Sequence, residues 1–259
     1  MAASSDAVLA PTTTFGVSVP RVWRKRGLLI GGAILLVVVL MALLAPWLSA
    51  YSPYDQQLDK RLIGFGTVAV SAPIGITLGL LGGYYGGRVD LAVMYLVMVR
   101  LSLPIVLVAL AVVGLIGSHL TIIMAVLASL LWDRFVVVTR SLVMQLRERE
   151  FVLAARAVGS SDVAILGREI LPNIVAPLTV VATLEMANAI LLEAALSFLG
   201  LGVKPPEASW GLMIAEAKDM VFFEPWLINI PGFALFALVI GINLFGDGLR
   251  DALSIERSA

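Results

Sequence analysis

The sequence contains no cysteine and a single histidine, His119. The lack of cysteine excludes disulfides, thiolate metal ligands and a cysteine nucleophile, and one imidazole leaves little for histidine chemistry. Charged residues are also scarce, at 14% of 259 residues, and 18 basic side chains are balanced by 18 acidic ones. A chain without net positive charge offers no overall attraction to nucleic acid. We therefore expect no metal site and no nucleic-acid partner.

Hydrophobic residues, in contrast, make up 60% of the chain, and the mean hydropathy is +1.00. Soluble domains are nearer half apolar and a quarter charged, so this composition predicts an integral membrane protein. A helix needs about 20 apolar residues to cross roughly 30 Å of hydrocarbon. Six stretches fit this requirement, at residues 28–47, 62–85, 91–116, 120–138, 173–199 and 226–245. The expected fold is an all-α integral membrane protein with six transmembrane helices in a lipid bilayer.

Basic residues are distributed unevenly between the segments that connect these spans. If the N-terminus is cytoplasmic, twelve Lys and Arg residues lie inside and four lie outside, as the positive-inside rule requires. Both termini are therefore expected in the cytoplasm. Residues 1–27 are interpreted as a cytoplasmic tail and residues 28–259 as the transmembrane domain. The first apolar run is longer than the 7–15 residues of a signal-peptide core, so it predicts an uncleaved helix.

The segment at about residues 148–172 is polar enough to lie in water but is patterned as two short helices. Small or apolar side chains recur in it at helical spacing, namely Phe151, Ala154, Ala155 and Val158. Gly159 suits a left-handed position after the first helix, and residues 160–162 offer an N-cap and an acidic first turn. Pro172 is expected to end the second helix, because the residue before a proline disfavours helical dihedrals. Such a hairpin either binds a soluble partner or packs on its own bundle.

The same segment resembles the cytoplasmic EAA signature of ABC-importer permeases, in which Glu-Ala-Ala, three residues, Gly and nine more residues lead to Ile-x-Leu-Pro. Five residues fall on this frame, namely Ala154, Ala155, Gly159, Leu171 and Pro172. Leu153 replaces the Glu and Glu169 replaces the Ile. Further stretches between Gly79 and Leu253 are similar to the C-type permease subunit of oligopeptide or dipeptide importers, for example GLLGGYYGGRVD and ILLEAALSFLGLGVKPPEASWG. These subunits belong to the binding-protein-dependent transport inner-membrane component family.

The resemblance implies a type I ABC-importer permease fold with a cytoplasmic coupling helix in a bacterial inner membrane. It implies a second permease subunit, two ATPase subunits and an extracytoplasmic peptide-binding protein as partners. The implied ATPase-coupling residues are Phe151, Ala154, Ala155, Gly159, Leu171 and Pro172. Oligopeptides or dipeptides are the implied cargo, with nickel, glutathione or haem as alternatives. An ion-coupled secondary transporter is a more distant alternative, which would require inverted repeats with matching broken helices.

The chain has no G-x-x-x-x-G-K-[ST] motif for binding ATP. We therefore do not expect it to be an enzyme or to hold a cofactor. If the resemblance holds, the partner ATPase subunits bind ATP and Mg²⁺ and hydrolyse the ATP.

Ionisable residues inside a span are costly in lipid, so they usually face the bundle interior or water. Four of these are candidates for the translocation path, namely Arg100, Asp133, Glu185 and Glu193. Pairing between helices is the alternative. For Asp133 and its neighbour Arg134, near the inner end of the expected fourth span, snorkelling to the surface is a further alternative. Glu185 and Glu193 are eight residues apart and share one helix face.

Three other features concern the connections and packing of the spans. Gly75, Gly79 and Gly83 recur every fourth residue, which predicts close helix packing. Residues 200–225 form an external segment with a short amphipathic helix, which either contacts the binding protein, gates the passage or covers the bundle. Members of the family that this chain resembles usually have some thirty more residues between the first two spans. Either this protein lacks that external segment or the given sequence omits part of it between residues 55 and 63, and we favour omission.

Overall fold

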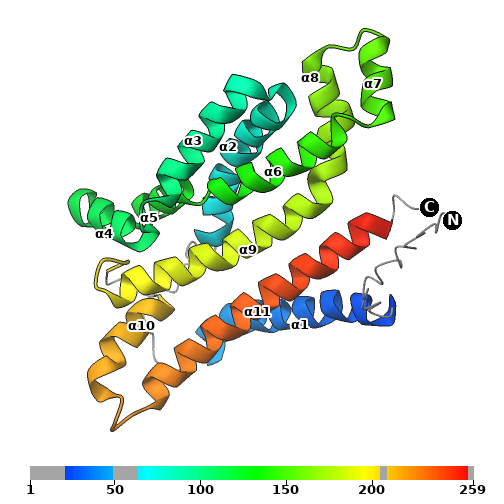
Figure 1. Ribbon diagram of the computed structural model, residues 1–259. Coiled ribbons are helices and arrows are strands. Elements are labelled where there is room, and N and C mark those ends of the chain that lie inside the picture. Colours follow the sequence, from blue (N-terminus) through cyan, green and yellow to red (C-terminus); the bar gives the residue numbers. More distant parts are fainter. Residues whose placement is uncertain (1–20, 49–62, 205–208, 256–259) are drawn as a thin grey trace, which may run out of the picture.

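The computed structural model describes residues 21–48, 63–204 and 209–255, and these form a bundle made of helices (Figure 1). The helices are α1 Arg21–Leu48, α2 Ile63–Tyr85, α3 Gly87–Leu101, α4 Ile105–Ile116, α5 Leu120–Leu130, α6 Asp133–Leu146, α7 Glu150–Ala157, α8 Asp162–Ala164, α9 Leu171–Phe198, α10 Trp210–Ala217 and α11 Trp226–Ile255. A π-helical turn, Ile165–Ile170, joins α8 to α9, and a 3₁₀ turn, Lys218–Met220, follows α10. The expected all-α architecture is confirmed. Most of the expected tail and the connection at residues 49–62 lie outside the described residues.

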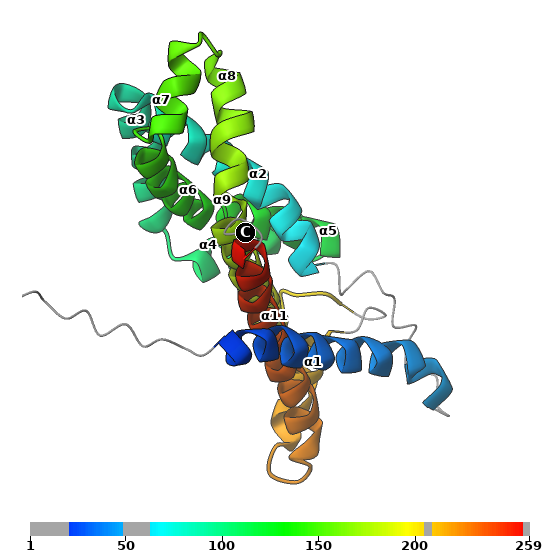
Figure 2. The ribbon, with the colours of Figure 1, turned by 90° about the vertical axis from the view of Figure 1, so that its right-hand side faces the viewer.

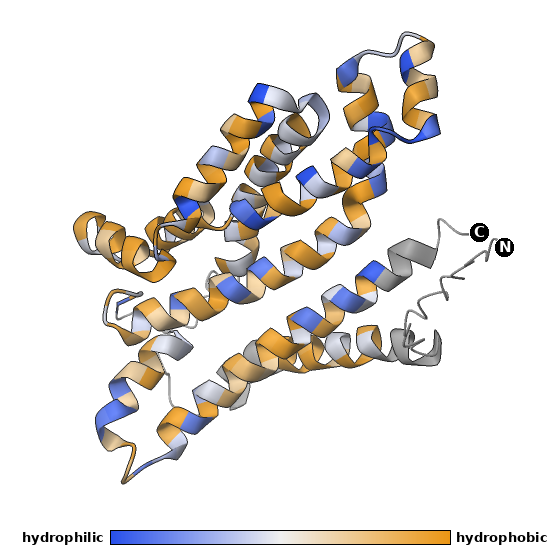
Figure 3. Cartoon of the chain, viewed as in Figure 1, coloured by the Kyte–Doolittle hydropathy of each residue, from blue (hydrophilic) through white to orange (hydrophobic). Residues whose placement is uncertain are grey.

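Four described helical segments are long and apolar enough to cross a membrane, at Ile63–Tyr85, Leu120–Leu146, Asp162–Phe198 and Trp226–Arg250. A fifth is formed if α3 and α4 are taken together. The described part of α1 contributes a shorter apolar stretch, Gly27–Leu40. Apolar residues dominate the long helices, whereas hydrophilic residues gather where the α7–α8 hairpin joins the bundle (Figure 3).

The expected third span is broken near its centre. The axes of α3 and α4 differ in direction by 77°. Pro104 lies at the break with extended backbone dihedrals and precedes the first residue of α4. A proline has no N–H to donate to the preceding turn, and its ring restricts the residue before it. The expected third span is therefore a sharply bent pair of helices.

The fourth expected span is longer than its pattern indicated. It ran to about residue 138 in the sequence analysis, but α5 and α6 together form a segment that ends at Leu146. Asp133 and Arg134 therefore lie near the middle of this segment and not near its inner end. The extension includes Arg140, whose charge is paired with Asp90 of α3. A basic residue with a partner in the bundle does not mark the end of a membrane helix.

The prediction that Pro172 ends a helix is wrong. The chain is helical from Asp162 through Pro172 to Phe198. The π-helical turn Ile165–Ile170 lies directly before the proline, and such a wider turn accommodates a residue that cannot donate its own backbone hydrogen bond. Asn173 donates a side-chain hydrogen bond of 2.6 Å to the carbonyl oxygen of Glu169. The second arm of the hairpin is consequently continuous with a long membrane helix.

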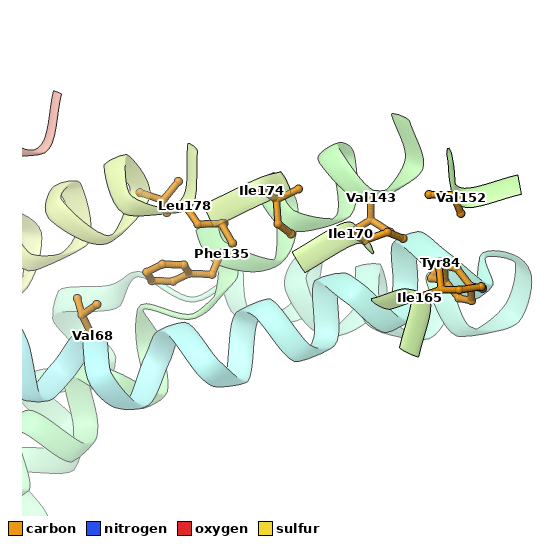
Figure 4. Packing of buried hydrophobic residues seen from close by; sticks show 10 residues of the cluster. Val68, Tyr84, Phe135, Val143, Val152, Ile165, Ile170, Ile174 and Leu178 are labelled. Atoms are coloured by element: carbon orange, nitrogen blue, oxygen red, sulfur yellow. The ribbon is translucent and has the colours of Figure 1, made fainter. Parts of the chain in front are cut away.

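Helix packing follows the glycine pattern seen in the sequence. Gly75, Gly79 and Gly83 of α2 lie against the backbone and side chains of α6, where a Cβ atom would collide. The predicted close packing is confirmed. The buried core beside this contact runs along α2, α6 and α9 up to the hairpin (Figure 4). Helices α1 and α11 cross each other as a second layer beside α9 (Figure 2).

Candidate functional site

The hairpin of α7 and α8 turns sharply at Gly159. This glycine has φ +86°, a left-handed conformation that costs other residues strain. The N–H of Ser160 donates to the carbonyl oxygen of Ala155 at 3.0 Å, as in a Schellman motif. Ser161 caps the next helix by accepting a hydrogen bond from the N–H of Ala164. The predicted glycine turn and N-cap are both confirmed.

One side of the hairpin is anchored in the bundle core. Val152, Ile165 and Ile170 are fully buried in a cluster with Tyr84 of α2 and Val143 of α6 (Figure 4). The other side exposes apolar side chains around the turn of the hairpin, namely Phe151, Leu153, Val158 and Val163. Val158 is 86% exposed and Val163 79% exposed. The hairpin therefore has a fixed base and an apolar tip that the described part of the chain leaves uncovered.

The residues assigned to ATPase coupling fall on both sides of this hairpin. Phe151, Ala154 and Gly159 are exposed. Ala155 and Leu171 are half-buried and pack against the core, and Pro172 is half-buried at the start of α9. Their role in coupling stays a prediction.

Hydrogen bonds join the tip of α2 to both arms of the hairpin. The Tyr84 hydroxyl donates to Asp162 Oδ1 at 2.8 Å and accepts from Arg156 at 3.0 Å. The Arg156 guanidinium also lies over the Tyr84 ring, 5.4 Å from its centre. The hydrogen bond with Tyr84 raises the pKa of Arg156 above its ordinary value, so this side chain stays charged. A buried tyrosine thus connects a membrane helix to α7 and α8.

Charged residues form a second cluster near the middle of the membrane segments. Arg100 of α3 pairs with Asp133 of α6 at 3.2 Å and donates to the carbonyl oxygen of Leu130, which the break between α5 and α6 leaves available. Arg134 Nε lies 3.2 Å from Oε1 of the buried Glu185 of α9. Each arginine is therefore paired with one carboxylate, Arg100 with Asp133 and Arg134 with Glu185.

Glu193 is not part of this cluster, although it shares a helix face with Glu185. It accepts a hydrogen bond of 2.7 Å from Ser197, which in turn accepts from Ser209 at 3.2 Å. Ser209 also caps α10, so Glu193 belongs to the contact between α9 and α10. The structure thus brings together three of the four path candidates, Arg100, Asp133 and Glu185, and separates the fourth. Their role in translocation stays a prediction.

Comparison with known families identifies the chain. Residues 75–255 match the family described as "Binding-protein-dependent transport system inner membrane component". This chain belongs to that family. Residues 19–64 match the "N-terminal TM domain of oligopeptide transport permease C". The family consists of membrane permease components, so the expected C-type permease resemblance is confirmed, and the chain acts with partners of a binding-protein-dependent transport system.

Several relatives in this family are similar along most of the chain. The "Di/tripeptide transport system permease protein DppC" of Pseudomonas aeruginosa (strain UCBPP-PA14) is 35% identical over 266 residues, covering 88% of each chain. The "Dipeptide transport system permease protein DppC" of Haemophilus influenzae is 32% identical and covers 89% of this chain and 90% of its own length. The protein of that name from Alkalihalophilus pseudofirmus is 40% identical over 191 residues, 74% of this chain and 63% of its own length.

For this permease family member, sequence reasoning missed the residues that fasten the hairpin and those that fasten the turn between α2 and α3 to α6. Tyr84 and Asp90 were quoted only as part of the GLLGGYYGGRVD stretch. Gly86 and Gly87, both with positive φ, turn the chain between α2 and α3 and bring Asp90 to Arg140 at 2.6 Å. Nearby, Arg147 donates to the carbonyl oxygen of Gly83 at 3.1 Å. The signal in the sequence was a pair of tyrosines between two glycine pairs at the end of a predicted span.

The Tyr84 hydroxyl offers a direct test of this fastening. Replacing Tyr84 by Phe removes both hydrogen bonds but keeps the ring in the core, so we expect about 1 kcal/mol less protection of the hairpin. Amide hydrogen exchange in residues 150–164 should then be roughly fivefold faster. Tyr85→Phe is the matched control, because the Tyr85 side chain is half exposed and makes no described hydrogen bond. Equal exchange in the two variants would mean that the hydroxyl does not hold the hairpin.

Proposed function

We propose that the chain is one of two permease subunits of an ATP-driven importer for oligopeptides or dipeptides. An extracytoplasmic binding protein delivers the cargo, and two ATPase subunits supply the energy. The observation that supports this cargo most strongly is the set of relatives named as peptide, dipeptide or di/tripeptide permeases, with 35% identity over 88% of the chain in one case. Nickel, glutathione and haem are the alternative cargoes.

The proposed topology has six crossings with both termini in the cytoplasm. Helix α1 provides the first crossing and the bent pair α3–α4 the third. In support, the start of α1, the end of α11 and the α7–α8 hairpin lie toward one end of the bundle, whereas α4 and α10 lie toward the other (Figure 1). The excess of basic residues in the segments at the hairpin end supports a cytoplasmic location for that end.

The proposed coupling element is the α7–α8 hairpin, which docks on an ATPase subunit. Its exposed apolar residues Leu153 and Val158 lie outside the spans, and Val163 lies at the very start of the Asp162–Phe198 segment. A partner surface at this tip would remove them from water. The path from the docking surface into the membrane is stiff, because helix continues from Asp162 to Phe198 and Tyr84 ties both arms of the hairpin to α2. ATP and Mg²⁺ bind to the ATPase subunits and no cofactor binds to this chain.

This proposal is tested by adding charge to the hairpin tip. The double variant Val158→Asp/Val163→Asp should reduce the ATPase that co-purifies with the permease at least tenfold, because burying each carboxylate in an apolar contact costs several kcal/mol. ATP-dependent uptake of labelled di- to pentapeptides into proteoliposomes should fall with it. Both valines are exposed, so the variant should still insert and fold.

Val221→Asp is the matched control, since this exposed valine follows the 3₁₀ turn after α10, at the opposite end of the bundle. It should retain the ATPase subunits. Normal co-purification with the double variant would contradict docking at the tip. ATPase binding without uptake of any peptide by the wild-type importer would leave the coupling proposal standing and point to one of the alternative cargoes.

A further inference from the structure

Arg134 lies at a depth where an exposed cation is unusual. It is near the midpoint of the Leu120–Leu146 segment, and its partner Glu185 is near the midpoint of α9. The Arg134 side chain is 59% exposed, whereas that of Glu185 is 1% exposed. The pair thus joins a carboxylate inside the bundle to a guanidinium on its surface.

This surface is unsuited to lipid. An arginine facing hydrocarbon at mid-depth is strongly unfavourable. The face that carries Arg134 therefore meets either an aqueous passage or another subunit.

The guanidinium retains unused donors. Its Nε is engaged by Glu185, and within the described part of the chain it has no further hydrogen-bond or ion-pair partner. Arg100, in contrast, is mostly buried and is occupied by Asp133 and the Leu130 carbonyl. The two terminal amino groups of Arg134 can bind a carboxylate through paired hydrogen bonds.

We propose that Arg134 binds the C-terminal carboxylate of the peptide as it crosses the membrane. This inference rests on the proposed peptide-importer function. Peptides of different sequence share only their backbone and termini, so a carrier of many peptides needs contacts to those groups. Glu185 is a positioning residue, because its buried carboxylate holds the guanidinium at Nε but is itself covered. Contact of Arg134 with an acidic residue of the second permease subunit is the competing assignment.

The test compares two labelled cargoes in proteoliposomes that contain the complete importer and its binding protein. The cargoes are trialanine with a free C-terminal carboxylate and trialanine amide. For each cargo the uptake rate of a variant is divided by that of the wild type, so that any preference of the binding protein cancels. Arg134→Gln should lower the uptake of trialanine about tenfold, because a charge-assisted hydrogen-bonded pair is lost. It should change the uptake of trialanine amide less than about twofold.

Two further variants separate binding from folding. Arg134→Gln leaves Glu185 buried without its cation, so Arg134→Gln/Glu185→Gln removes both charges at similar volume and should show the same selective loss. Arg88→Gln, which removes an exposed arginine near the start of α3, should leave the ratio of the two cargoes unchanged. A photoreactive group next to the free carboxylate should label residues around 134 in the wild type, and this labelling should disappear in the double variant.

The outcomes are distinguishable. Equal loss of both cargoes in the Arg134 variants, or labelling elsewhere in the wild type, would overturn the carboxylate site. Loss of the second permease subunit from the double variant would assign Arg134 to the subunit contact and also overturn it. A wild-type importer that hydrolyses ATP but takes up neither peptide would refute the proposed cargo itself.

Discussion

Replacing Gly79 by Val is expected to prevent α2 and α6 from packing and to remove most of the folded permease from the membrane. A Cβ at this position would lie 2.6 Å from Cβ of Thr139 and 2.8 Å from the carbonyl oxygen of Val136. Backbone and Cβ atoms cannot rotate away, so the helices must separate. Overpacking a core costs about 1–3 kcal/mol, and separating two long helices adds the loss of their remaining contacts.

Size-exclusion chromatography of a fluorescent fusion would measure this effect as the fraction of monodisperse permease. We expect at least a tenfold decrease, which corresponds to about 1.4 kcal/mol or more. Gly232→Val is the control, because no atom lies within 4 Å of a Cβ placed at Gly232 of α11. A Gly79→Val protein with wild-type yield and thermal stability would show that α2 and α6 do not approach this closely.

The glycine contact also shows what the sequence can and cannot predict. The four-residue repeat of Gly75, Gly79 and Gly83 predicted a close contact, because only small residues let helix backbones approach. It did not identify α6 as the partner. That choice depends on how the helices rotate and cross, which a single-helix pattern does not encode.

Local features of the hairpin were predictable, but its connection to the membrane helix was not. Gly159 and Ser161 act within one turn of chain, so their roles follow from residue type. Pro172 was misread because the rule for residues before proline assumes a regular α-helix. The π-helical turn ahead of it depends on packing of Ile165 and Ile170, which are fully buried in the core.

The charged pairs were the least predictable part of the site. Ionisable residues in apolar segments marked Arg100, Asp133 and Glu185 as unusual, but the partners within each pair are 33 and 51 positions apart. Asp133 was predicted near the end of its span because the span was expected to end at about residue 138, whereas the segment continues to Leu146. Only the three-dimensional arrangement separates Glu193, held by Ser197, from the Arg134–Glu185 pair.

Replacing Asp133 by Leu is expected to destabilise the bundle strongly, because it leaves Arg100 charged and mostly buried at 15% side-chain exposure. Removing one partner of a buried ion pair costs about 3–5 kcal/mol. Replacing both partners by apolar residues of similar size is much less damaging, so Arg100→Met/Asp133→Leu should regain most of the loss. A remaining deficit of about 1 kcal/mol is expected, because the Leu130 carbonyl loses its donor.

Unfolding of the purified permease in increasing SDS would compare the two single variants with the double variant. The order of stability should be wild type, double variant and then Asp133→Leu. If the loss of stability in the double variant equals the sum of the losses in the two single variants, Arg100 and Asp133 do not interact. Recovery in the double variant would show that the damage comes from an unmatched charge, so the pair matters by cancelling two buried charges where α3 meets the broken α5–α6 segment.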